Sequence, residues 1–96
     1  MSSAAPEVSG SARPVLGRGF RLQYEPAQQA HVLLYPEGMV KLNTSAGEIL
    51  RRCNGEHTVA EIIAELETAF SATDLTGDVH AFMKFALEKH WLEIRP

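Results

Sequence analysis

The side chains that could do chemistry in this sequence are four histidines, one cysteine and scattered carboxylates. A zinc site needs histidine, cysteine or carboxylate ligands at short, regular spacings, and no such spacing occurs here. The nearest case is His57 with Glu61, four residues apart, but His57 falls just before an expected helix start. We therefore expect no metal site. The histidines are His31, His57, His80 and His90.

The sequence also gives no support for nucleophilic catalysis or for phosphate binding. Cys53 falls on the apolar face of an expected helix, where cysteine behaves as a small hydrophobic residue, and no histidine is placed by sequence to activate it. The glycines do not form the spacings GxxxxGK[ST] or GxGxxG that cradle phosphates. The glutamates between 61 and 67 fit a solvated helix face. We expect no enzyme activity and no cofactor.

The composition of the chain limits the kinds of partner and the cellular compartment that we expect. The 96 residues carry nine basic and twelve acidic side chains, a net charge of −3, which argues against a nucleic-acid partner. A single cysteine fits a reducing compartment. Residues 1–19 contain no apolar run of signal-peptide length, and no later segment could span a membrane. We expect a cytoplasmic protein with a flexible N-terminal arm at 1–19 and one folded domain at 20–96.

The first half of that domain predicts an antiparallel sheet. Apolar and polar residues alternate over 20–25, and 31–35 is almost wholly apolar and rich in β-forming residues. Pro36-Glu-Gly38 predicts a tight reversal, because Pro fixes φ and Gly tolerates a positive φ. A third strand over 39–42 completes a three-stranded meander.

Three helices are predicted to follow. Ser45-Ala-Gly-Glu48 and Thr58-Val-Ala-Glu61 each fit a capping box, and Asn54-Gly55 fits a helix stop. Asp74 is the expected cap of a third helix that ends near His90, and 91–94 is a short extended tail. The fold class is therefore α+β and winged-helix-like, with a three-stranded antiparallel sheet followed by three helices.

The second and third helices differ in the width of their apolar faces. At 100° per residue, the large apolar side chains of the second helix fall within about 100°, which one core can cover. Those of the third sweep about 200°; they are Leu75, Val79, Phe82, Met83, Phe85, Ala86 and Leu87. The third helix is therefore either buried between other elements or leaves an apolar flank for a partner.

Three uses of such a surface stay open on the residues alone. An exposed strand edge beside that flank could bind a peptide through main-chain hydrogen bonds. The flank could instead be covered by the arm, the tail or a second copy, with a homodimer formed through an exposed strand edge or by strand exchange. A winged-helix regulator that acts on DNA or a transcription partner is the alternative function, although acidic residues offset Lys84 and Lys89.

Several segments resemble the PqqD family, the small peptide-binding proteins of pyrroloquinoline quinone biosynthesis. The resemblance rests on HVLLYPEGMVKLNT at 31–44, SAGEIL at 45–50, Cys53-Asn-Gly55 and TVAEII at 58–63, with RLQYEPAQ at 21–28 and KHWL at 89–92. It extends from about Phe20 to Leu92. Tyr24 stands where tryptophan is common in the family, and His90 where glycine often ends the helix.

The resemblance implies a peptide-recognition domain that binds the precursor peptide PqqA and presents it to PqqE. PqqE is a radical S-adenosylmethionine enzyme that carries its own iron–sulfur clusters and cross-links a glutamate and a tyrosine within the peptide. In the family the peptide adds as a strand beside the third strand, against the last helix. The corresponding residues here are Met39, Val40, Lys41, Leu42, Val79, Phe82, Met83 and Ala86.

Overall fold

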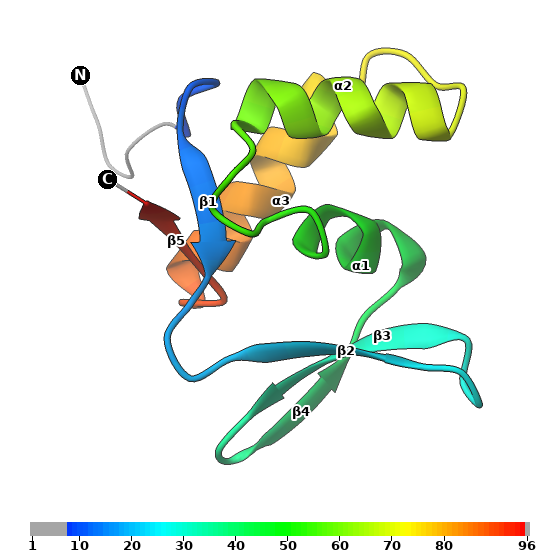
Figure 1. The fold of residues 1–96 in the computed structure, drawn as a ribbon, viewed down its shortest axis with the longest axis vertical. Helices are drawn as coiled ribbons and strands as arrows, with labels where there is room; N and C mark the ends of the chain where they lie inside the picture. Colours follow the sequence, from blue (N-terminus) through cyan, green and yellow to red (C-terminus); the bar gives the residue numbers. More distant parts are fainter. Residues whose placement is uncertain (1–7, 96) are drawn as a thin grey trace.

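The computed structural model describes residues 8–95; residues 1–7 and Pro96 lie outside the described part of the chain. Strands and helices follow in the predicted order, with one extra strand at each end (Figure 1). The fold is α+β, as predicted. The elements are β1 (Arg13–Leu16), β2 (Arg21–Glu25), β3 (Ala30–Tyr35), β4 (Gly38–Lys41), α1 (Thr44–Leu50), α2 (Val59–Ala69), α3 (Thr76–Glu88) and β5 (Leu92–Arg95).

The predicted meander is present as a three-stranded antiparallel sheet in the order β2-β3-β4. Leu22, Leu33 and Val40 oppose one another across the three strands and so share one face, which packs on the core. The reversal between β3 and β4 takes only two residues, because Tyr35 already pairs with Gly38. Gly38 begins the next strand and is not among the positive-φ residues, so the expected reason for a glycine there was wrong.

A second, two-stranded sheet joins the two ends of the described chain. Strand β1 pairs antiparallel with β5, from Arg13 opposite Arg95 to Leu16 opposite Leu92 (Figure 1). This corrects the expectation of a flexible arm for the part that the structure describes, because 13–16 is strand and Val8 is buried in the core. Residues 1–7 of the expected arm lie outside the described residues.

Helix α1 begins and ends earlier than predicted. Its cap is Asn43, whose Oδ1 accepts a hydrogen bond from the Ala46 backbone N–H at 2.8 Å, and not Ser45. The helix ends at Leu50, before the predicted stop, and the positive φ of Gly55 (83°) belongs to the loop beyond it.

The predicted capping box of α2 is confirmed, with the Thr58 side chain and the Glu61 side chain each accepting from the other's backbone N–H. The predicted cap of α3 is wrong. Asp74 has a φ of 60°, Leu75 occupies the cap position without a side-chain hydrogen bond, and Glu67 accepts from the Leu75 backbone N–H instead. Helix α3 ends at Glu88 with Lys89 as its C-cap, and His90 follows with a φ of 65°.

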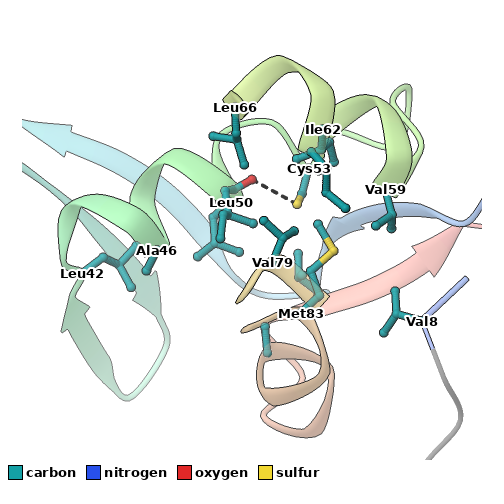
Figure 2. Packing of buried hydrophobic residues seen from close by; sticks show 14 of the residues in the cluster. Val8, Leu42, Ala46, Leu50, Cys53, Val59, Ile62, Leu66, Val79 and Met83 are labelled. Atoms are coloured by element: carbon teal, nitrogen blue, oxygen red, sulfur yellow. Dashed lines mark hydrogen bonds between the residues drawn. The ribbon is translucent and has the colours of Figure 1, made fainter. Parts of the chain in front are cut away.

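The core lies where the three helices meet the sheet. Figure 2 shows Val79 and Met83 of α3 pointing toward Leu50, Cys53 and Ile62 from α1, its following loop and α2. Gly47 lets α1 approach β3, because a Cβ at this position would lie 2.7 Å from His31 Nδ1. No helix within residues 8–95 is long and apolar enough to cross a membrane.

Candidate functional site: an open strand edge and an apolar helix flank

Strand β4 forms one edge of the three-stranded sheet, and its backbone orientation follows from one hydrogen bond. The Leu42 N–H donates to the His31 carbonyl of β3 at 3.0 Å. Since successive backbone groups of a strand point to opposite sides, Val40 also faces β3, whereas Met39 and Lys41 face outward. Within the described chain β4 pairs only with β3. Met39 and Lys41 therefore offer main-chain donors and acceptors to an incoming strand.

The side chains of the four predicted strand residues fall into two groups. Met39 is 51% exposed and Lys41 is exposed, so both are accessible. Val40 is half-buried against the core, and Leu42 is part of the core cluster. The strand can thus contact a peptide mainly through its backbone, with Val40 as its apolar contribution on the helix side.

The predicted residues of α3 are buried more deeply than a surface groove requires. Met83 and Ala86 are 0% exposed and Val79 is 3% exposed, so their side chains hold the helix to the core. Phe82 is half-buried and packs at the edge of that cluster. Of these four, Phe82 alone offers substantial accessible surface.

Two aromatic residues that the site prediction left out, Phe85 and Trp91, continue the flank of α3 beyond Phe82. Phe85 is 43% exposed, and its ring centroid lies 5.4 Å from that of Trp91 and 6.4 Å from that of Phe82. Lys89 Nζ stands 5.5 Å from the Phe85 ring centroid, within cation–π range. The exposure of Phe85 could have been predicted from the sequence, because helical spacing places it about 120° around the helix from Val79. A core centred on Val79 and Met83 leaves that end of the arc outside.

A pocket of about 270 Å³ lies beside the first turn of the same helix. Its walls come from α1, the end of α2, the following loop and the start of α3. Its lining is mostly apolar, with Glu48 and Asp78 among its members, and the α1 wall begins three residues after β4 ends. The lining residues are Thr44, Ser45, Glu48, Ile49, Leu66, Phe70, Ala72, Leu75, Asp78 and Val79.

A buried arginine just after α1 fixes the position of α1 against α2. Arg52 is 7% exposed and bridges Glu48, at 2.7 Å, and Glu65, at 2.6 Å. Its hydrogen bond is the main reason that the pKa of Glu48 is lowered, with Arg51 contributing less. All of these groups are satisfied within the protein. Their role is to hold one wall of the pocket in place.

The cysteine and the histidines take no part in this surface. Burial raises the pKa of the Cys53 thiol to about 12, and the thiol donates to the Ile49 carbonyl at 3.2 Å (Figure 2). A thiol that stays protonated at neutral pH is not a nucleophile. Among residues 8–95, no three His, Cys, Asp or Glu side chains are grouped as metal ligands.

Known proteins are similar to this chain in sequence and in fold. The family profile "Coenzyme PQQ synthesis protein D (PqqD)" matches residues 30–92. A "PqqA binding protein" of Stutzerimonas stutzeri (strain A1501) is 46% identical over 90 residues, which cover 93% of this chain and 98% of that protein. Another, from Pseudomonas aeruginosa (strain UCBPP-PA14), is 52% identical over 83 residues, 85% of this chain and 90% of that protein.

A solved structure extends the similarity to three dimensions. It is the solution NMR structure of the PqqD truncation of Methylobacterium extorquens PqqCD, described as a functional, stand-alone recognition element for ribosomally synthesized and post-translationally modified peptides. It superposes with a TM-score of 0.71 at 32% identity, over 88% of this chain and 93% of that one. Sequence and fold agree, and this chain belongs to the PqqD family.

Proposed function

We propose that this chain is a non-catalytic peptide-binding protein of pyrroloquinoline quinone synthesis that binds PqqA as an added strand at the open edge of β4. The observation that carries the binding mode is the outward-facing backbone of Met39 and Lys41. The relatives in Stutzerimonas and Pseudomonas are themselves PqqA binding proteins.

The flank of α3 would supply the side-chain contacts. In an added strand, alternate side chains point to the helix side of the sheet. Val40 packs against the core on that side, Phe82 and Phe85 are accessible on α3, and the pocket at Ile49 and Leu75 can take a larger side chain. Main-chain hydrogen bonds would then provide affinity, and these apolar contacts would provide selectivity.

The benefit to the pathway would be proximity. A bound and oriented PqqA reaches the radical S-adenosylmethionine enzyme PqqE at a raised effective concentration. The iron–sulfur clusters and the S-adenosylmethionine belong to that enzyme, and this chain supplies position. The PqqE partnership, a cytoplasmic location and self-association through a strand edge remain parts of this proposal.

The test separates the backbone of Lys41 from its side chain. Lys41→Pro removes the outward N–H of β4, and edge strands tolerate proline where no ladder bond is lost. We expect it to weaken PqqA binding about tenfold or more, since a ladder hydrogen bond contributes about 0.5–1.5 kcal/mol and proline also obstructs the neighbouring strand. Lys41→Ala keeps the N–H and should stay within about threefold of wild type.

Titration of labelled protein with PqqA measures both variants and maps the site. Amide shifts should centre on 39–41, on Phe82 and Phe85, and on the pocket. Equal affinity of Lys41→Pro and wild type, in variants that melt alike, would contradict strand addition at β4. Shifts confined to β2 would move the peptide to the opposite edge of the sheet.

A further inference from the structure

The pocket beside the first turn of α3 has two walls that are held in different ways. One wall comes from α1, whose position is fixed by the ion pairs of Arg52. The other wall comes from residues 70–75, which join α2 to α3 (Figure 1) and contribute Phe70, Ala72 and Leu75 to the lining. No residue of this second wall takes part in the ion pairs found among residues 8–95.

The backbone of 70–75 takes conformations that non-glycine residues adopt at a cost. Ser71 has a φ of 50° and Asp74 a φ of 60°, both in the left-handed region. Residues in this region persist where contacts from the surrounding structure hold them. Phe70 is 51% exposed, and Ala72 and Leu75 are half-buried. Burial alone therefore holds this wall less firmly than it holds the core.

Glu67 of α2 supplies two of the hydrogen bonds that hold this loop. Its backbone carbonyl accepts from the Ala72 N–H at 2.9 Å, and its side-chain Oε2 accepts from the Leu75 N–H at 3.0 Å. Among residues 8–95, no other side chain makes a hydrogen bond to 70–75. The bond to Leu75 ends at the cap position of α3, which has no side-chain cap of its own. One side chain thus fixes the point where the loop becomes α3.

The contact depends on the reach of the Glu67 side chain and not on its charge. Its partner is a backbone N–H, which needs an acceptor oxygen at the right distance. Glu67 belongs to none of the ion pairs found in the described part of the chain. An amide oxygen at the same distance would serve as well.

We propose that Glu67 is a positioning residue for peptide recognition, in a role that rests on the proposed function. Its side chain holds the wall at Leu75 and so sets the shape of the pocket that takes an apolar side chain of the peptide. Glu67 itself need not touch the peptide. Affinity falls in proportion to the fraction of molecules whose site has the binding shape. Loss of this hydrogen bond lowers that fraction and weakens binding without any change at β4.

Two substitutions at position 67 separate reach from charge. Glu67→Gln keeps the side-chain length and an acceptor oxygen, so its affinity for PqqA should stay within about threefold of wild type. Glu67→Asp keeps the charge but is one methylene shorter, so it loses the bond to Leu75 and should bind about tenfold more weakly. Glu56→Asp makes the same shortening at an exposed residue outside the pocket lining and should bind like wild type.

Calorimetric titration with PqqA, on full chains well below their melting temperatures, measures all four proteins. A role in stability alone would lower the melting temperature of Glu67→Asp and leave the affinity of the folded protein unchanged. Equal affinity of Glu67→Asp and wild type would therefore overturn the proposal. A loss in Glu67→Gln as large as that in Glu67→Asp would also overturn it, because charge and not reach would then be decisive.

A second measurement locates the effect on the peptide. Each apolar residue of PqqA is replaced by alanine in turn, and each peptide is titrated into wild type and into Glu67→Asp. One replacement should weaken binding to wild type several-fold more than binding to Glu67→Asp, because both changes act on the same pocket contact and do not add. If every replacement has the same effect on both proteins, Glu67 does not position the pocket.

Lys41→Pro keeps this outcome apart from that of the proposed function. Strand addition at β4 predicts that Lys41→Pro weakens binding by the same factor in wild type and in Glu67→Asp, since the two changes affect separate contacts. Normal binding by Lys41→Pro together with the peptide coupling would remove β4 and keep Glu67. Weak binding by Lys41→Pro without the coupling would keep β4 and remove Glu67.

Discussion

Helices α2 and α3 are both amphipathic, but they divide their apolar residues differently. Helix α2 buries Val59, Ile62, Ile63 and Leu66 on one narrow face, and its start is fixed by a capping box. Helix α3 buries Val79, Met83 and Ala86, has no side-chain cap, and leaves Phe85 43% exposed. The wide apolar arc of α3 is thus divided between the core and an accessible surface. A helix can stabilise a fold and present a binding surface when its apolar arc is wider than its core contact.

The largest expected effect is a loss of stability when a core side chain is truncated, and this loss should be similar in the two helices. Ile62→Ala in α2 and Met83→Ala in α3 each remove a side chain that is at most 1% exposed. Each should lower the free energy of unfolding by about 2–5 kcal/mol, through lost burial and a new cavity. Urea denaturation measures both. If Met83→Ala cost no more than a surface change, the core face of α3 would be wrongly placed.

A smaller effect should separate the two faces of α3. Phe85→Ala should change the free energy of unfolding by about 1 kcal/mol or less, because Phe85 is partly solvated. It should nevertheless weaken PqqA binding about tenfold, as loss of an aromatic contact commonly does. Calorimetric titration beside a melting curve gives both values. Lys84→Ala, an exposed change on the same helix, is the matched control; equal binding by the two variants would remove Phe85 from the site.

The smallest expected effect is a loss of folding stability at acidic pH. Among residues 8–95 the ion pairs link α1 with the loop after it and with α2, and none includes α3. Because the pKa of Glu48 is lowered, chiefly by Arg52, its contribution to stability is present above its unfolded pKa and is lost as pH falls through the folded value. Stability should therefore decline below about pH 4.5, the ordinary value.

Glu48→Gln provides the control for that decline. The variant should be less stable than wild type at neutral pH, and the difference should shrink toward acid. Melting temperatures of both proteins between neutral pH and pH 3 would measure this. A constant difference across that range would mean that Glu48 titrates alike in the folded and unfolded chains.

Local patterns predicted those parts of the fold that local chemistry decides. Alternation over 20–25 and the two-residue reversal after Tyr35 defined the meander, and the Thr58 and Glu61 pair defined the start of α2. The N-cap of α1 was predicted wrongly. Asn43 and Ser45 are both residues that cap helices well, and only the backbone geometry decides between them. Strand β1 was missed because its partner lies at the far end of the sequence and Pro14 weakens its strand signal.

The site was predicted only in outline. The sequence defined which residues of α3 are apolar, but not which part of the arc faces the core. The resemblance assigned Val79, Met83 and Ala86 to the groove, although their side chains lie in the core, whereas Phe85 and Trp91 were left out. The orientation of the β4 backbone depends on register with β3, which no pattern within β4 contains.

The antiparallel ribbon of β1 and β5 has a consequence for how the domain can be joined to other proteins. Arg13 and Arg95 are neighbours, so the first strand begins where the last strand ends, toward the upper end of the long axis, while β4 lies toward the lower end (Figure 1). A connection made next to Arg13 or next to Arg95 would start from nearly the same point and leave the β4 edge clear. The relative from Methylobacterium extorquens is a truncation of a longer chain, PqqCD. A domain of this kind can be joined to another chain before β1 or after β5, with little change in the distance from the point of attachment to the β4 edge.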